Sequence, residues 1–356
     1  MTEDIIEELK NKEFKKKFIQ GLNKLGFPLE FQIRTRLIEK GYNSVREGVF
    51  TVVDNSNQEI TKSVDIYANK DKEIKILEDL TLVIGLQLIG DCKFSSDKNR
   101  FLLAIPDTSN PQNKMFIGPL LTNFQSANYG VYRNSEIVSQ FILKYGEIFI
   151  ASDIKDTSKD HIVSKSKDKN KKPEDIDKNV PEYERIFNIT ENTILPPLRQ
   201  NFLHWQSYAY NDSMELMDFP LNLSKEELVK LLKKHYYYGK LIIPFILTSK
   251  PILAPEMDTN GKIVDIKKLP FVLYEHSALK PNDYLEILTG SYDIGVFVCN
   301  EQGFDDFIVY IEKLFSILFE EIITNIQKHP FRLIENFNEI KKQKEEIKKI
   351  KESKIT

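Results

Sequence analysis

The residues with the clearest capacity for chemistry are Asp91 and Lys93, in the segment "LIGDCKFSS" at 88–96. They follow an apolar run and stand two positions apart. Side chains two apart on a strand point to the same face, so the acid and the lysine would project together while Cys92 points away. Charges at buried positions are costly unless they are paired or bind something. This segment is therefore either a solvated strand end or a place where chemistry happens.

The spacing of an acid and a lysine carries little information by itself, because "EIK" and "DIK" also occur elsewhere in the chain. Context distinguishes Asp91 and Lys93 from these other pairs. They end a long apolar strand, and an earlier predicted strand carries its own isolated acid, Asp65, in "SVDIYA". The three side chains therefore become a candidate cluster.

If the two strands are neighbours, Asp65 and Asp91 bring two carboxylates to one place and Lys93 adds an ammonium. Like charges that close are unfavourable unless a cation bridges them. Mg²⁺ prefers oxygen ligands and keeps several waters, so two carboxylates and a backbone carbonyl suit it. A metal-bound water has a lowered pKa and can attack a phosphodiester, while the lysine can orient that water or offset developing charge.

The elements that must position this cluster follow from apolar periodicity and from capping signals. We expect an amphipathic helix at 3–20 and a second helix in "FPLEFQIRTRLIEKGY", which Gly41 ends as a C′ glycine. Glu30 falls in the first turn of the second helix, where an acid suits the helix dipole. The apolar positions of that helix are Phe31, Ile33, Leu37 and Ile38. A hairpin with strands at 45–53 and 60–68 follows, and then a central strand at 81–95 that is apolar on both faces.

The rest of the chain also alternates between strands and helices. Strands are predicted at 100–107, 240–249, 269–276 and 292–300, and helices at 134–149, 224–239 and 303–329. The segment 155–179 has almost no apolar content, which is typical of an exposed or disordered insertion. The predicted organisation is a core at 1–150, a lysine-rich flexible insertion at 151–180, an α/β extension or second domain at 181–330, and a charged helical tail at 331–356.

Composition excludes several classes of protein. The chain has 356 residues, is 41% hydrophobic and carries a formal net charge of −3, so nucleic-acid contact would have to come from local basic patches. Two cysteines exclude a disulfide framework and a Cys-rich zinc site. We find no metal-ligand spacing of histidines, phosphate-binding glycine loop or serine-hydrolase motif. The charged N-terminus and the short apolar runs predict a soluble, cytoplasmic protein.

The order of these features resembles the PD-(D/E)xK nuclease superfamily, and within it Mrr-like restriction endonucleases and archaeal Holliday-junction resolvases. The matching residues are Glu30 on the helix, Asp65 between hydrophobic residues on the hairpin, and Asp91 and Lys93 after "LIG". The resemblance covers about residues 27–105. The chain departs from the pattern in three ways: no proline precedes Asp65, the motif acid is Asp rather than Glu, and a long segment between the two acids leaves the register open.

This resemblance implies an α/β fold with a restriction-endonuclease-like mixed β-sheet core flanked by helices, here with a C-terminal α/β extension. It implies a site that binds Mg²⁺ or Mn²⁺ through Asp65, Asp91 and the backbone carbonyl of Cys92. Glu30 would be a further ligand or an acid beside the ligands, and Lys93 would be the catalytic lysine. A polar residue on the following helix, Gln125 or Gln140, would complete the site.

The activity implied by the resemblance is that of a Mg²⁺-dependent endodeoxyribonuclease that cleaves double-stranded DNA, in bacterial restriction or anti-phage defence. Such a protein would act as a homodimer or with a partner protein in a defence complex. Two alternatives stay open: a catalytically inactive nuclease-fold module that binds nucleic acid or a partner protein, and a nuclease directed at RNA.

Overall fold

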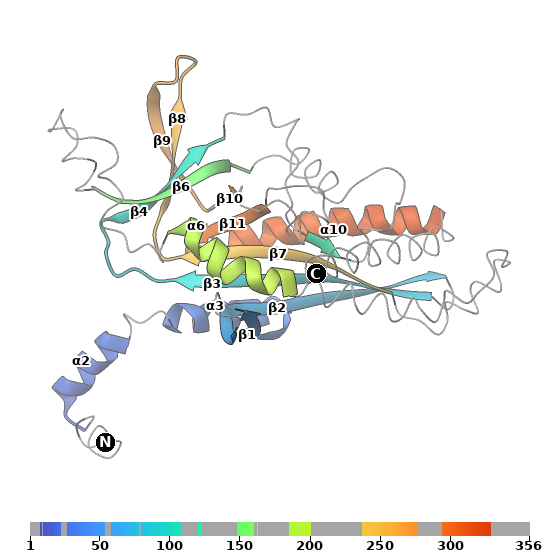
Figure 1. Cartoon of the computed structure of the whole chain (residues 1–356), viewed down its shortest axis with the longest axis horizontal. Coiled ribbons are helices and arrows are strands. Elements are labelled where there is room, and N and C mark those ends of the chain that lie inside the picture. The colour runs from blue at the N-terminus through green and yellow to red at the C-terminus, as the bar shows by residue number, and fades with distance from the viewer. Residues whose placement is uncertain are drawn as a thin grey trace.

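The computed structural model describes residues 8, 10–22, 27–53, 58–77, 80–107, 120–122, 148–159, 162, 185–200, 237–276 and 294–328. These residues form an α/β protein in which one large mixed sheet has helices on both faces (Figure 1). The α/β class predicted from the sequence is confirmed at this level. None of the described helices is both long enough and apolar enough to span a membrane.

Eleven strands of the described chain belong to this sheet, in the order β1-β2-β3-β7-β11-β10-β6-β4-β8-β9, with β5 paired to β7. The strands are β1 (Asn43–Val53), β2 (Glu59–Leu77), β3 (Leu80–Lys93), β4 (Arg100–Pro106), β5 (Leu120–Thr122), β6 (Ile150–Ser158), β7 (Tyr237–Thr248), β8 (Ile252–Met257), β9 (Ile263–Leu269), β10 (Phe271–His276) and β11 (Ile294–Asn300). The helices are α2 (Lys12–Leu22), α3 (Phe27–Glu39), α6 (Ile186–Ile189) with the π-helix Thr190–Ile194 after it, and α10 (Phe304–Lys328).

The strand that carries the candidate cluster, β3, lies between two strands from distant parts of the sequence. It pairs antiparallel with β2 along one side and parallel with β7 along the other. β11 lies beside β7, also in parallel. The strands of residues 237–300 therefore extend the same sheet as the N-terminal strands, with β7 and β11 near its centre.

Helices cover both faces of β3, which explains why its sequence is apolar at successive positions. On one face, α3 and α10 contact a core that includes Leu86, Leu88 and Cys92 of β3. On the other face, Ile89 contacts a second core that contains α6 and the helical residues after it. The predicted central strand is thus confirmed, and it is buried on both sides.

The second predicted helix is confirmed as α3, and Gly41 just beyond it has a φ of +82°, as a C′ glycine does. Its buried row is Leu29, Ile33 and Leu37, at a spacing of four. Two of the predicted apolar positions, Phe31 and Ile38, are exposed instead. A spacing of four keeps one narrow stripe on the sheet, and these two side chains fall outside it.

Three predicted segments need correction. The flexible insertion at 151–180 begins with a strand, because β6 pairs with β4 and β10 and buries Ala151, Ile154 and Asp156. The N-terminal helix predicted at 3–20 is interrupted, because Glu8 is helical, Lys10 and Asn11 are not, and α2 then runs from Lys12 to Leu22. The helix predicted at 224–239 has its last three residues in β7, and the rest of it falls outside the described residues. The helix predicted at 134–149 and the charged tail fall almost entirely outside the described residues.

Candidate active site at the end of β3

Asp91 and Lys93 lie at the C-terminal end of β3, and their side chains contact each other. Lys93 Nζ lies 2.6 Å from Asp91 Oδ2. The Asp91 carboxyl is buried, whereas the Lys93 side chain is 40% exposed. The predicted common direction of these two side chains is therefore observed. The pair combines a desolvated acid with an ammonium that solvent can reach.

Asp65 stands across from Asp91 on the neighbouring strand. The last pair of the β2–β3 ladder is Ile66 with Gly90, the residues that adjoin Asp65 and Asp91, and the two carboxyls are close enough to interact. The ladder extends back to Leu77 and Leu80, so the described part of the long segment between the two acids is paired strand. Two like charges this close on neighbouring strands are unfavourable, and Lys93 offsets one of them through its contact with Asp91.

The β1–β2 ladder has a β-bulge at Asp65 and Ile66 of β2. The bulge lies where the pairing between β2 and β3 ends. Arg46 pairs with Tyr67 and Gly48 pairs with Val64, so three residue steps on β2 match two steps on β1. A bulge bends its strand and changes the direction of side chains, and bulges are common beside active sites. Here the Asp65 carboxylate accepts a hydrogen bond from the Cys92 backbone N–H, at 2.7 Å from Oδ2.

Arg34 of α3 connects the helix to the bulge. Its Nε and Nη2 donate to the Asp65 carbonyl at 3.1 and 2.7 Å, which satisfies a backbone group beyond the end of the β2–β3 ladder. Arg34 Nη2 also lies 3.7 Å from Glu30 Oε2, one helical turn earlier. Glu30 is recognisable from the sequence pattern and Arg34 is not, although its spacing of four from Glu30 is a signal for an ion pair on a helix.

Glu30 lies near Asp65 and Lys93, whose charges both act on its carboxyl. Burial raises the pKa of its carboxyl, the negative charge of Asp65 raises it further, and Arg34 acts in the opposite direction. The predicted site residues therefore come together at one end of the β2–β3 hairpin. Gln125 and Gln140, the two candidates for a completing residue, fall outside the described residues.

The pKa values of both charged groups of the "DCK" segment are raised, which favours the neutral form of the acid and the charged form of the lysine. Burial raises the pKa of Asp91 to about 7, against the effect of Lys93, and the Asp65 carboxyl adds to the increase. Burial lowers the pKa of Lys93. The attraction of the Asp91 carboxylate raises it by more, so the pKa of Lys93 is raised overall. Lys93 therefore keeps its proton at neutral pH and acts as a cation rather than as a base.

The donor set fits a divalent cation that keeps most of its other ligands as water or substrate. Asp65 and Asp91 offer two carboxylates, and the Cys92 N–H points toward Asp65. The N–H and C=O of one strand residue point to the same side, so the Cys92 carbonyl faces the same end of the ladder. Among the described residues, no group of three or more His, Cys, Asp or Glu side chains could hold a metal ion.

Gly90 and Cys92 have packing roles that explain their presence between the charged residues. A Cβ at Gly90 would meet the Phe245 ring of β7 at 2.2 Å, so only glycine fits without displacing that ring. Cys92 is buried in the core under α3 and α10, and burial raises the pKa of its thiol. The Cys92 side chain is therefore a neutral core residue.

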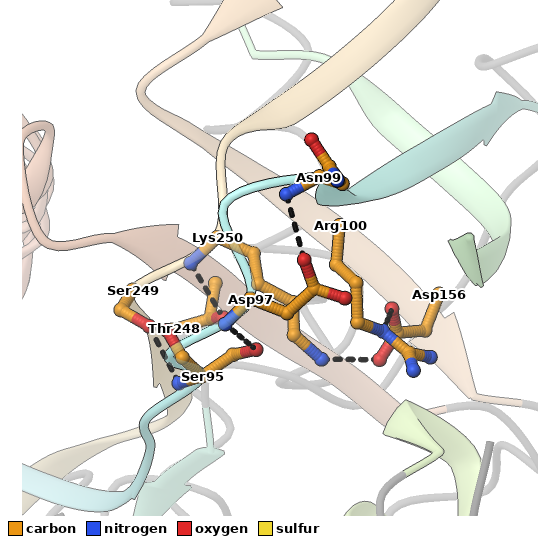
Figure 2. A network of polar contacts seen from close by, with 8 residues as sticks. All are labelled: Ser95, Asp97, Asn99, Arg100, Asp156, Thr248, Ser249 and Lys250. Atoms are coloured by element: carbon orange, nitrogen blue, oxygen red, sulfur yellow. Dashed lines mark hydrogen bonds and ion pairs between the residues drawn. The ribbon is translucent and has the colours of Figure 1, made fainter. Parts of the chain in front are cut away.

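A polar network holds the chain beyond Lys93 (Figure 2). Ser249 N–H donates to the Lys93 carbonyl at 3.1 Å, and Ser95 N–H donates to Ser249 Oγ at 2.8 Å. Next to it, Asp156 of β6 accepts from Lys250 and from Arg100 Nε, the latter at 3.1 Å. Sequence reasoning missed this network, because Asp156 fell in the segment assigned to a flexible insertion.

Comparison of the chain with protein-family models, curated proteins and solved structures found no significant match.

We expect the stability of the metal-free protein to fall as pH rises from about 4 to 7. A carboxyl whose pKa is raised by folding binds more protons in the native state than in the unfolded chain, so ionising Asp91 costs stability. At about 1.4 kcal/mol for each unit by which the pKa is raised, the decrease should amount to at most about 4 kcal/mol. Urea unfolding in the presence of a chelator, at a series of pH values, measures it. In Asp91→Asn this part of the slope should disappear, and an unchanged slope would show that another group is responsible.

Proposed function

We propose that this protein is a metal-dependent phosphodiesterase of the PD-(D/E)xK type that acts as a DNA endonuclease. The observation that carries the proposal is the convergence at the end of β3: the Asp65 carboxyl beside that of Asp91, and Lys93 paired with Asp91. Glu30 on α3 adds the fourth residue of the pattern. A mixed sheet with helices on both faces also agrees with the restriction-endonuclease-like core that the resemblance implies.

The roles of the residues follow from their environments. Asp65 and Asp91 would hold a divalent cation, which supplies Lewis-acid activation of water and of the scissile phosphate. Lys93, which is charged and accessible to solvent, would stabilise negative charge that develops on the phosphate during attack. Arg34 would fix the position of Asp65 through its carbonyl. Glu30 would hold Arg34 and add negative charge beside the metal ligands.

A comparison of substrates and metals tests this proposal. Purified protein would be incubated with supercoiled plasmid, linear duplex DNA, single-stranded DNA and RNA, each with Mg²⁺, with Mn²⁺ and with chelator. We expect cleavage of duplex DNA that requires the metal. Preferential cleavage of RNA would support the same site chemistry with another substrate and would reject the DNA assignment. Equal cleavage with chelator would reject the metal-dependent mechanism.

A second candidate, a catalytically inactive module that binds nucleic acid or a partner protein, is favoured by one observation. Each carboxylate already has a partner within the chain: Asp91 has Lys93, and Asp65 has the Cys92 N–H. A site satisfied in this way could persist without metal. Titration with Mn²⁺ followed by electron paramagnetic resonance distinguishes the two candidates, since binding lost in Asp65→Asn supports the enzyme and no binding supports the module.

A further inference from the structure

The β8–β9 hairpin forms one end of the sheet and extends away from its central strands (Figure 1). In the part of the chain that the structure describes, no strand pairs with the outer side of β9. Three apolar side chains of this strand are more than half exposed: Ile263 at 56%, Val264 at 62% and Ile266 at 55%. An open edge with exposed apolar side chains is a template for pairing with another strand.

The backbone of Ile266 faces this open edge. Its partner on β8 is Pro255, which has no N–H to donate. The Ile266 N–H instead donates to the carboxylate of the preceding residue, Asp265, at 2.8 Å from Oδ1. Both features fit a cross-strand pair whose backbone groups point away from each other, so the N–H and C=O of Ile266 are directed outward.

Two acidic side chains of the β8–β9 hairpin lie close to a single lysine. Glu256 stands directly opposite Asp265, and like charges in this position are unfavourable. Lys267, one pleat away on the same face, pairs with Glu256. Two carboxylates therefore share one lysine, and the strand has a place for a second cation beside Asp265.

We propose that two copies of this chain associate through β9, as antiparallel strands centred on Ile266. In this register the outward backbone groups of the two Ile266 residues bond to each other, which releases the Asp265 carboxylate from its own neighbour. Asp265 then faces Lys267 of the partner subunit, and the same contact occurs again across the twofold axis. The result is a continuous sheet through two subunits, in which exposed apolar side chains of both strands are covered.

The charge pattern selects this register over its neighbours. Centring the pair on Asp265 would oppose two carboxylates, and centring it on Lys267 would oppose two ammonium groups. Only the register centred on Ile266 places opposite charges at both flanking positions. The edge lysines and the Asp265 side chain could also serve to keep the edge unpaired, and in that case the protein would be a monomer.

The oligomeric state of the full chain tests this proposal, and it is independent of the nuclease assignment. Sedimentation velocity over a concentration series should show a monomer–dimer equilibrium for the natural sequence. Asp265→Lys places lysine opposite Lys267 of the partner subunit at both positions, and should weaken the dimer by about tenfold or more. The double variant Asp265→Lys with Lys267→Glu restores opposite charges, and should recover the dimer.

Glu73→Lys provides a matched control, since Glu73 is an exposed acid on β2 at the other end of the sheet. It makes the same change of net charge and should leave the equilibrium as it is. A natural sequence that stays monomeric throughout the series overturns the proposal. A dimer that is indifferent to Asp265→Lys, or that the double variant fails to restore, overturns it as well, because the dimer would then use another surface.

Discussion

Replacing Lys93 by methionine should lower metal-dependent DNA cleavage by roughly 10²–10³-fold, the usual loss when one preorganised charge-stabilising donor is removed from an active site. Methionine keeps the length and apolar stem of lysine and removes only the ammonium. Single-turnover cleavage of a duplex substrate measures the effect on chemistry separately from product release. Asp91→Asn should be at least as severe under the proposed mechanism, because it removes a metal ligand and the partner of Lys93.

The chain offers a close control for this experiment. Asp153 and Lys155 on β6 have the same acid-x-lysine spacing and form an ion pair of 3.9 Å, but both side chains are about half exposed. Lys155→Met should therefore leave cleavage within about twofold of the natural protein, as expected for a surface position. Equal activity of Lys93→Met and Lys155→Met would reject the assignment of the site to the end of β3.

Replacing Asp156 by alanine should lower the free energy of unfolding by about 3–5 kcal/mol. Asp156 is buried and holds both Lys250, which is buried, and Arg100 (Figure 2). Removing the carboxylate leaves a buried ammonium without a counter-charge, which costs more than the pair contributed. Equilibrium unfolding in urea, followed by circular dichroism, measures the change.

Asp153→Asn, on the same strand but exposed, should change stability by less than about 0.5 kcal/mol. A combined variant, Asp156→Leu with Lys250→Met, should be less destabilised than Asp156→Ala, because it leaves no uncompensated charge at Lys250. If Asp156→Ala lost less than about 1 kcal/mol, Lys250 would have to reach solvent or become neutral at little cost, and the network would be unimportant for stability.

The parts of the site that the sequence predicts are those whose signals are local. Side chains two apart on a strand share a face, so the contact between Asp91 and Lys93 could be predicted from spacing alone. The helix with Glu30 carries its own start and stop signals, and Gly41 ends it as predicted. That the strands carrying Asp65 and Asp91 are neighbours could only be assumed from the sequence, and the β2–β3 ladder supplies both their pairing and its register.

The missed features depend on pairing between distant segments. Nothing in "KLIIPFILTS" indicates that this strand lies beside β3, more than a hundred residues earlier. The buried His276 pairs with Glu191 at 2.5 Å, and a separation of 85 residues gives no motif to detect. β6 was missed because its charged residues hide the few apolar ones that it buries. Asp156 is satisfied by Arg100 of β4 and by Lys250, which lies between β7 and β8.

The position of β3 between β2 and β7 has a consequence for biosynthesis. β2 leaves the ribosome just before β3 and can pair with it at once, whereas β7 is translated much later. Until residues 237–248 have been made, β3 presents an open edge and apolar side chains on both faces, a combination that favours aggregation. Fragments that end before β7 should be poor candidates for expression, and a chaperone that shields this edge would act during synthesis of the middle third of the chain.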